Sequence, residues 1–164
     1  DKNLGAYIQK QTGREMVLWD GSCMVHEIFS LEKINLLRKK NPDAKLIAHP
    51  ECEESLLVLA DYIGSTTALL KYTKECDAQT FIVATETGIL HQMFKNSPDK
   101  TFIPAPPDNS CACNDCPHMK LNTLEKLYNC LKYEQPELLM ESDLISKSRQ
   151  PIQRMLDLSA KFGL

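Results

Sequence analysis

The sequence lacks any long apolar run and any marked excess of one charge. No segment approaches the roughly 18 apolar residues of a membrane-spanning helix, and no basic stretch followed by an apolar one opens the chain. The 164 residues carry 19 basic and 22 acidic side chains, a formal net charge of −3. Because no basic face is present, nucleic acids and anionic membranes are poor partners. We therefore expect a cytoplasmic protein. A small anionic substrate would have to be bound by local hydrogen-bond donors, because there is no basic face to attract it.

Hydrophobic residues make up 43% of the chain, and seven residues are cysteine. A chain of 164 residues is long enough for one ordinary domain, or for one and a half smaller ones, with a sizeable core. An odd number of cysteines in a chain too large to need disulfide staples argues for a reducing compartment with free or metal-bound thiols. The chain starts with Asp1, without a methionine, and passes directly into a helical pattern. We expect it to be a fragment of a longer protein.

Short apolar runs alternate with helical patterns. The runs that predict buried strands are 16–19, 45–48, 62–63, 81–84 and 101–104. Helices are expected at 3–13, 31–40, 56–60, from 68 onward, at 89–94, at 122–131 and at 142–162, with Asn3, Ser30 and Asn122 as N-caps. The alternation predicts an α/β fold with parallel strands flanked by helices. The tail after the last strand has no strand of its own, so we expect it to pack on another domain.

Chemically distinctive side chains follow the predicted strands. In parallel sheets, functional sites gather outside the carboxyl ends of the strands, where successive loops meet. The residues at such ends are Cys23, His49, Glu51, Ser65, Thr66, Thr85, Glu86 and Cys116. Their shared placement predicts a site at this edge.

The first two of these groups have both functional and structural interpretations. Cys23 and His26 are three residues apart, so a helix beginning here would place them on one face and would favour the thiolate. A packed cysteine beside a hydrogen-bonded histidine is the alternative. His49 and Glu51 flank Pro50, an arrangement suited to proton transfer or to binding an imine or hydroxyl. On this tripeptide alone, a solvated pair in a loop is the favoured interpretation.

Hydroxyl groups and a dense group of thiols form the other two candidates. Ser65 and Thr66 stand at a predicted helix start, where hydroxyls and amides can bind a carboxylate or phosphate, or simply cap the helix.

The three clustered thiols suggest a metal ion, an iron-sulfur cluster or redox exchange; they are Cys111, Cys113 and Cys116. The alternative function is a non-catalytic zinc or redox α/β module that uses these three thiols with His118. The remaining cysteines are assigned to packing: Cys52, Cys76 and Cys130.

Six motifs, in this order and with this loop spacing, resemble the quinolinate synthase family over nearly the whole chain. They are Asp1-Lys2-Asn3-Leu4-Gly5, Gly21-x-Cys23-x-Val25-His26, His49-Pro50-Glu51, Gly64-Ser65-Thr66, Ala84-Thr85-Glu86-x-Gly88 and Cys116-Pro117-x-Met119-Lys120. The resemblance implies the C-terminal portion of an enzyme built from three similar three-layer αβα domains with pseudo-threefold symmetry. Residues 1–23 would end the second domain, 24–116 would form the third, and 117–164 would be a helical tail that packs on the absent first domain.

The resemblance also implies a function. Members condense iminoaspartate with dihydroxyacetone phosphate to quinolinate, with loss of water and phosphate, a transferase-type and dehydratase-type step of de novo NAD biosynthesis. They use a 4Fe-4S cluster held by three cysteines, one from each domain. Cys23 and Cys116 match two of these ligands, and the third would lie outside this chain, so we expect the fragment alone to be inactive. Beyond the two substrates, the aspartate-oxidising enzyme that supplies iminoaspartate is a candidate partner.

The resemblance assigns roles to individual residues as well. His26, His49 and Glu51 match catalytic and substrate-binding positions, and Ser65 and Thr66 match residues that bind a substrate carboxylate or phosphate. Thr85 and Glu86 match a family motif without an assigned role. Some members carry C-x-x-C-x-x-C before the proline, whereas this chain carries C-x-C-x-x-C. The departure leaves Cys116 in place but argues against a disulfide switch between Cys111 and Cys113, whose bridging geometry would be strained.

Overall fold

The computed structural model describes residues 1–108 and 114–163. Two of the three clustered cysteines, Cys111 and Cys113, lie outside the described residues. By internal contacts the chain divides into two compact units, Asp1–Lys120 and Leu121–Leu164.

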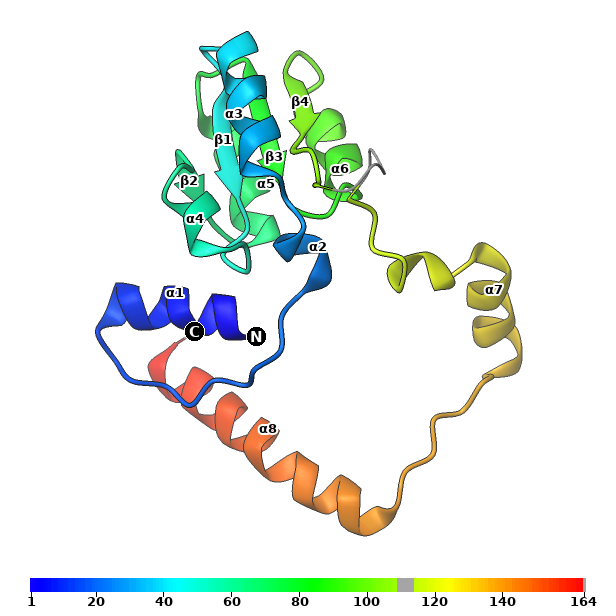
Figure 1. The fold of residues 1–164 in the computed structure, drawn as a ribbon. Helices are drawn as coiled ribbons and strands as arrows, with labels where there is room; N and C mark the ends of the chain where they lie inside the picture. The colour runs from blue at the N-terminus through cyan, green and yellow to red at the C-terminus, as the bar shows by residue number, and fades with distance from the viewer. Residues whose placement is uncertain (109–113, 164) are drawn as a thin grey trace. The chain divides into compact units, whose positions relative to one another are not determined.

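A four-stranded parallel sheet forms the centre of the first unit (Figure 1). Its strands are β1 (Lys45–Ala48), β2 (Tyr62–Ile63), β3 (Thr80–Ala84) and β4 (Thr101–Pro104), in the spatial order β2-β1-β3-β4. Ala48 pairs with both Ile63 and Ala84, so β1, β2 and β3 end at the same edge. These four strand predictions are confirmed, and so is the expected parallel arrangement.

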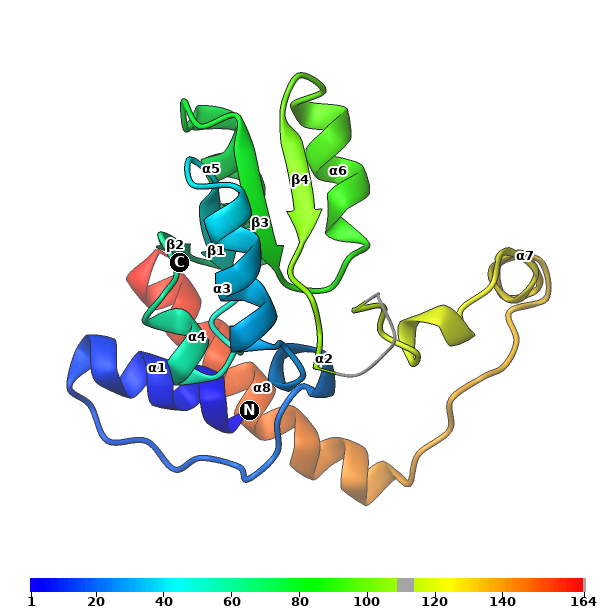
Figure 2. The ribbon, with the colours of Figure 1, turned by 45° about the horizontal axis from the view of Figure 1, so that its top comes forward.

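Helices cover both faces of the sheet and complete a three-layer αβα fold (Figure 2). One face packs against α3 (Leu31–Lys40) and α4 (Glu54–Leu57), and the other packs against α5 (Thr66–Glu75) and α6 (Ile89–Asn96). The side chain of Ser30 accepts a hydrogen bond from the backbone of Lys33, which confirms it as the N-cap of α3. The helix predicted over 56–60 is shorter than expected and ends at Leu57.

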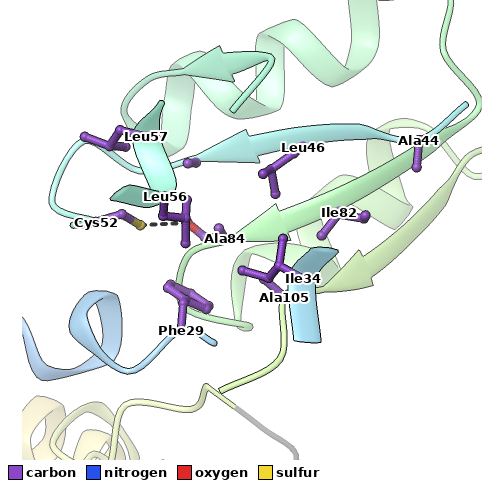
Figure 3. Close-up of a cluster of buried hydrophobic side chains, with 11 residues drawn as sticks. Phe29, Ile34, Ala44, Leu46, Cys52, Leu56, Leu57, Ile82, Ala84 and Ala105 are labelled. Carbon is purple, nitrogen blue, oxygen red and sulfur yellow. Dashed lines mark hydrogen bonds between the residues drawn. The ribbon is translucent and has the colours of Figure 1, made fainter. Parts of the chain in front are cut away.

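Alternation along the strands fills two separate cores. In β1, Leu46 and Ala48 belong to the core under α3 and α4, whereas Ile47 belongs to the core under α5 and α6. Figure 3 shows the first of these cores, with Leu46 directed into it. In β3, Ile82 and Val83 divide between the two cores in the same way. Because both faces are covered, the strands appear in the sequence as continuous apolar runs.

Two short helices precede the sheet, α1 (Lys2–Thr12) and α2 (Met24–Glu27). The N-cap of α1 is Asp1, which accepts a hydrogen bond from the backbone of Leu4, and the prediction of Asn3 was wrong. Gly13 ends the helix with φ 67°, in the left-handed region where glycine carries no steric penalty.

The strand predicted over residues 16–19 was wrong. These residues form no regular structure, and Val17 and Trp19 have relative exposures of 103% and 81%. An apolar run becomes a strand only where a neighbouring strand pairs with its backbone groups. The described sheet has no strand at this position.

The second unit contains α7 (Leu124–Tyr133) and α8 (Ser142–Phe162), and the 3-10 helix η1 (Met119–Leu121) precedes them. Thr123, rather than the predicted Asn122, caps α7 by accepting a hydrogen bond from the backbone of Lys126. Neither helix has a buried residue, and Cys130 is exposed within this chain. The packing role expected of Cys130, on a tail expected to pack on another domain, stays a prediction. In the described parts of the chain, no helix is both long and apolar enough to cross a bilayer.

Candidate functional site

The segment after β1 is anchored to the end of β3. The backbone N–H of His49 donates to the carbonyl oxygen of Ala84 at 3.1 Å. The thiol of Cys52 donates to the same oxygen at 3.4 Å (Figure 3). The N–H of Cys52 also donates to the carbonyl of His49 at 3.0 Å, which closes a turn. The turn therefore holds His49 and Glu51 at the carboxyl edge of the sheet.

Helix α2 begins at the predicted cysteine. Cys23 is its N-cap, and its carbonyl oxygen accepts from the N–H of His26 at 2.9 Å. The carboxylate of Asp1 uses one oxygen for Leu4 N–H at 2.8 Å and the other for Cys23 N–H at 2.9 Å. Sequence reasoning missed this role of Asp1. The preference for aspartate at helix N-caps was the available signal.

His26, His49 and Glu51 meet in one place. Oε2 of Glu51 lies 3.0 Å from Nδ1 of His26 and 3.6 Å from Nδ1 of His49. The two imidazole rings stack, with centroids 4.6 Å apart and an interplanar angle of 15°. A single carboxylate oxygen therefore faces both imidazoles, as a proton-transfer group requires.

The imidazole of His26 is held from both sides. The residue is 7% exposed, and its Nε2 lies 3.0 Å from Oγ1 of buried Thr85. Among the described residues, its Nδ1 has no partner that meets the directional requirements of a hydrogen bond, so the 3.0 Å approach of Glu51 is mainly an electrostatic contact.

Burial keeps both histidines neutral at pH 7. It is the main cause that lowers the pKa of His26, and the nearby His49 lowers it further, whereas Glu51 opposes the shift. Burial also lowers the pKa of His49, again against the effect of Glu51. Since both pKa values fall below the ordinary 6.5, both rings can accept a proton at neutral pH.

The thiol of Cys23 joins this group. Sulfur, nitrogen and oxygen atoms of Cys23, His26 and Glu51 all lie within 4.8 Å of one another, a spacing that suits a metal ion. Cys116 is also a half-buried free thiol, and its N–H donates to Oε1 of Glu86 at 3.4 Å. Its segment therefore lies against the loop that follows β3.

A family model described as NadA, Quinolinate synthetase A protein, matches residues 1–157. The chain belongs to this family. It is 60% identical over 159 residues to the quinolinate synthase of Microcystis aeruginosa, covering 97% of this chain and 50% of that protein. The identity is 59% to that of Rippkaea orientalis and 58% to that of Trichodesmium erythraeum, over 97% of this chain and 49% of each relative. The chain spans about half the length of the curated relatives it matches.

The donor atoms fit the iron-sulfur cluster that the family resemblance implies. Cysteine thiolates are the usual ligands of such clusters, and both Cys23 and Cys116 are free and half-buried. Cys23 further lies in a group with metal-binding spacing. The site of this family member therefore has suitable thiols on two of its segments.

Ser65 and Thr66 lie at the N-terminus of α5, after β2. Both are exposed, and Oγ of Ser65 accepts from the N–H of Ala68 at 3.3 Å. Gly64 N–H donates to the carbonyl of Ala48 at 3.1 Å, so this segment flanks the end of the strand that precedes His49. Within the described residues, no direct contact joins either hydroxyl to the histidines.

Proposed function

We propose that the full-length protein containing this chain is a quinolinate synthase, which condenses iminoaspartate with dihydroxyacetone phosphate to quinolinate with loss of water and phosphate. The family match supports this reaction, which belongs to de novo NAD biosynthesis. The observation that carries it is the approach of Cys23, His26 and Glu51 to within 4.8 Å, which joins a metal-binding thiol to acid–base groups. An aspartate-oxidising enzyme is the proposed source of iminoaspartate.

Cys23 and Cys116 would hold a 4Fe-4S cluster together with a third cysteine from outside this chain. Bound in this way, the cluster would supply Lewis-acid chemistry toward a substrate hydroxyl or carboxylate, through an iron left without a protein ligand. Proton transfer and substrate orientation are then the work of the side chains around it.

His26 and His49 would both take part in proton transfer, and they differ in how accessible they are to the substrate. The side chain of His49 is 17% exposed and that of His26 is 8% exposed, so His49 is the more accessible to substrate. A neutral imidazole can take a proton from the substrate, and the carboxylate of Glu51 then stabilises the imidazolium. Because burial lowers the pKa of both histidines, each releases the proton readily at neutral pH.

Ser65 and Thr66 would bind a carboxylate or phosphate of the substrate. Ser65 is the N-cap and Thr66 the first residue of a ten-residue helix, whose N-terminal N–H groups and dipole favour anions. Because both residues are exposed, their hydroxyls are accessible to a substrate. Ser65 and Thr66 would orient that substrate toward His49 and Glu51, which follow the neighbouring strand.

Residues 24–116 would form one of three similar αβα domains, with 1–23 ending the preceding domain and 117–164 forming a helical tail on the first. All four strands of the described sheet lie within 24–116, which supports this assignment. The three-domain arrangement would bring three cysteines, one from each domain, to one cluster.

Anaerobic reconstitution of the full-length protein tests the proposal, with iron, sulfide and zinc measured in wild type, Cys23→Ala and Cys116→Ala. We expect wild type to bind iron and sulfide and to form quinolinate, and both variants to lose the iron. Cys76→Ala, which removes another half-buried thiol, should retain it. Zinc binding that survives loss of Cys23, with no uptake of iron, would show instead a local zinc module built on Cys111, Cys113, Cys116 and His118.

A further inference from the structure

The loop after β3, residues 85–88, contacts both segments that carry the proposed cysteine ligands. On one side it contacts His26, three positions after Cys23, and on the other it contacts residues 114–116. We propose that this loop is a positioning element, in which Thr85 orients His26 and Glu86 holds the segment of Cys116. The part that concerns Cys116 rests on the proposed function, whereas the part that concerns His26 can be tested without any metal.

Thr85 orients His26 through a buried contact between residues 59 positions apart. Thr85 is 3% exposed, and its Oγ1 lies 3.0 Å from Nε2 of His26. Since Glu51 stands 3.0 Å from the opposite nitrogen, the favoured tautomer carries its proton on Nδ1, and Nε2 accepts from the threonine hydroxyl. The stiff χ1 of a β-branched side chain then keeps the ring in one orientation.

Glu86 joins the loop to the backbone of Cys116. Its Oε2 accepts from the N–H of Gly88 at 2.7 Å, and its Oε1 accepts from the N–H of Cys116 at 3.4 Å. The first bond holds the carboxylate within its own loop. The second bond fixes the backbone of Cys116, the residue whose thiol is the proposed ligand, relative to this loop.

Thr87 adds two contacts to the same segment. Its N–H donates to the carbonyl of Asn114 at 3.4 Å, and its hydroxyl donates to Oδ1 of Asp115. Asn114 is buried, and its Nδ2 donates to the carbonyl of Ala105 at 3.4 Å, after β4. The segment that ends at Cys116 is therefore held between the ends of β3 and β4.

The hydrogen bonds of this loop end on both segments that carry the proposed cysteine ligands. The contacts of Thr85 and Glu86 are polar and directional, and each ends on a group at or next to a proposed functional residue. Outer groups that orient metal ligands typically change metal affinity by about 10- to 100-fold when they are removed. The loop should therefore affect the site more than it affects the fold.

The test uses the full-length protein with Glu86→Ala, Gly88→Ala, Thr85→Val and Thr85→Ser. A Cβ at position 88 would lie 2.6 Å from Oε2 of Glu86, so Gly88→Ala displaces the carboxylate without removing it. Control variants are Glu75→Ala, which removes an exposed carboxylate on α5, and Thr73→Val, which removes a buried hydroxyl bonded to the carbonyl of Leu70.

Two measurements report on the site, and one reports on the fold. After anaerobic reconstitution, we expect Glu86→Ala and Gly88→Ala to release iron to a chelator about 10-fold faster than wild type. In metal-free protein labelled with 15N-histidine, Thr85→Val should shift the imidazole nitrogen resonances of His26, and Thr85→Ser should restore them. The thermal midpoint of each metal-free variant should fall no further than that of its control.

Release of iron at the wild-type rate together with unchanged His26 resonances would overturn the proposal. So would thermal midpoints that fall further than those of the controls while both site measurements match wild type, because the loop would then be structural only. If the wild-type protein binds no iron, the proposed function fails, and the His26 resonances of metal-free Thr85→Val alone decide this inference.

Discussion

The carboxylate of Glu51 lies 3.0 Å from Nδ1 of His26, and the same oxygen lies 3.6 Å from Nδ1 of His49. Two neutral imidazoles therefore share one negative charge at the edge of the sheet. Glu51 is therefore the group that opposes the effect of burial on the pKa values of both histidines, and this leads to the first prediction.

Glu51→Gln should lower the pKa values of His26 and His49 further, because the carboxylate is the group that raises them against burial. Deuterium exchange at the histidine Cε1–H, followed by mass spectrometry of the metal-free full-length protein, measures both pKa values. Quinolinate formation should fall by about 100-fold or more. Glu53→Gln, at an exposed neighbouring position, is the control and should change neither quantity. Unaltered histidine pKa values in Glu51→Gln would contradict this reading.

Buried His26 and half-buried His49 should make the fold sensitive to acid. Their folded-state pKa values lie below the unfolded value of about 6.5, so their contribution to stability is present above that pH and is lost as the pH falls through the folded values. The thermal midpoint of the metal-free protein, measured from pH 7.5 down to 5, should fall less steeply in His26→Gln than in wild type. The control is His91→Gln, at an exposed position on α6. Equal slopes in all three proteins would refute the prediction.

Cys52 should be the least reactive thiol near the site. Burial raises its pKa to about 12, so almost no thiolate is present at pH 8. Alkylation with iodoacetamide, quantified by mass spectrometry, should modify half-buried Cys76 faster than Cys52. The raised pKa also means that the stabilising contribution of Cys52 is complete below the unfolded pKa of about 8.5 and is lost as the pH rises toward 12. Rapid alkylation of Cys52 in the folded protein would contradict the assignment.

Asp1 should matter to the metal site as well as to its helix. Asp1→Ala removes the N-cap of α1 and the acceptor for Cys23 N–H, whereas Thr123→Ala removes only the N-cap of α7. Each should reduce the free energy of unfolding by about 1 kcal/mol. Only Asp1→Ala should also speed the loss of iron to a chelator after reconstitution. Equal iron loss in both variants would show that Asp1 acts through general stability.

Substitutions at position 65 can separate helix capping from substrate binding. Ser65→Ala removes the cap on Ala68 N–H, at a cost of about 1 kcal/mol, whereas glycine at an N-cap costs only a few tenths. If Ser65 binds the substrate, both variants should raise the KM of full-length enzyme by a similar factor despite their unequal stabilities. A KM that follows the loss of stability would identify Ser65 as a cap only.

Local patterns in the sequence were sufficient for most secondary structure. The strands at 45–48, 62–63 and 101–104 and the helix at 142–162 appear with the predicted bounds, because their apolar runs and helical spacing are local signals. The run at 16–19 failed because a strand depends on a partner that a local pattern cannot supply. The N-caps of α1 and α7 shifted by one or two residues, since several capping side chains were available at each start.

In the candidate site, too, some features could be predicted from local sequence patterns and others depend on the tertiary structure. The sequence by itself determined that His49 and Glu51 follow a strand, and the parallel topology brings their loop to one edge with the loops after β2 and β3. His26 lies in α2, after a run that forms no strand, so its place at this edge was not determined by the predicted strands. Only the tertiary structure decided that one oxygen of Glu51 faces both imidazoles, and that Thr85 contacts His26 across 59 positions. Such contacts depend on distances between residues that are remote in the chain, and no local periodicity encodes those distances.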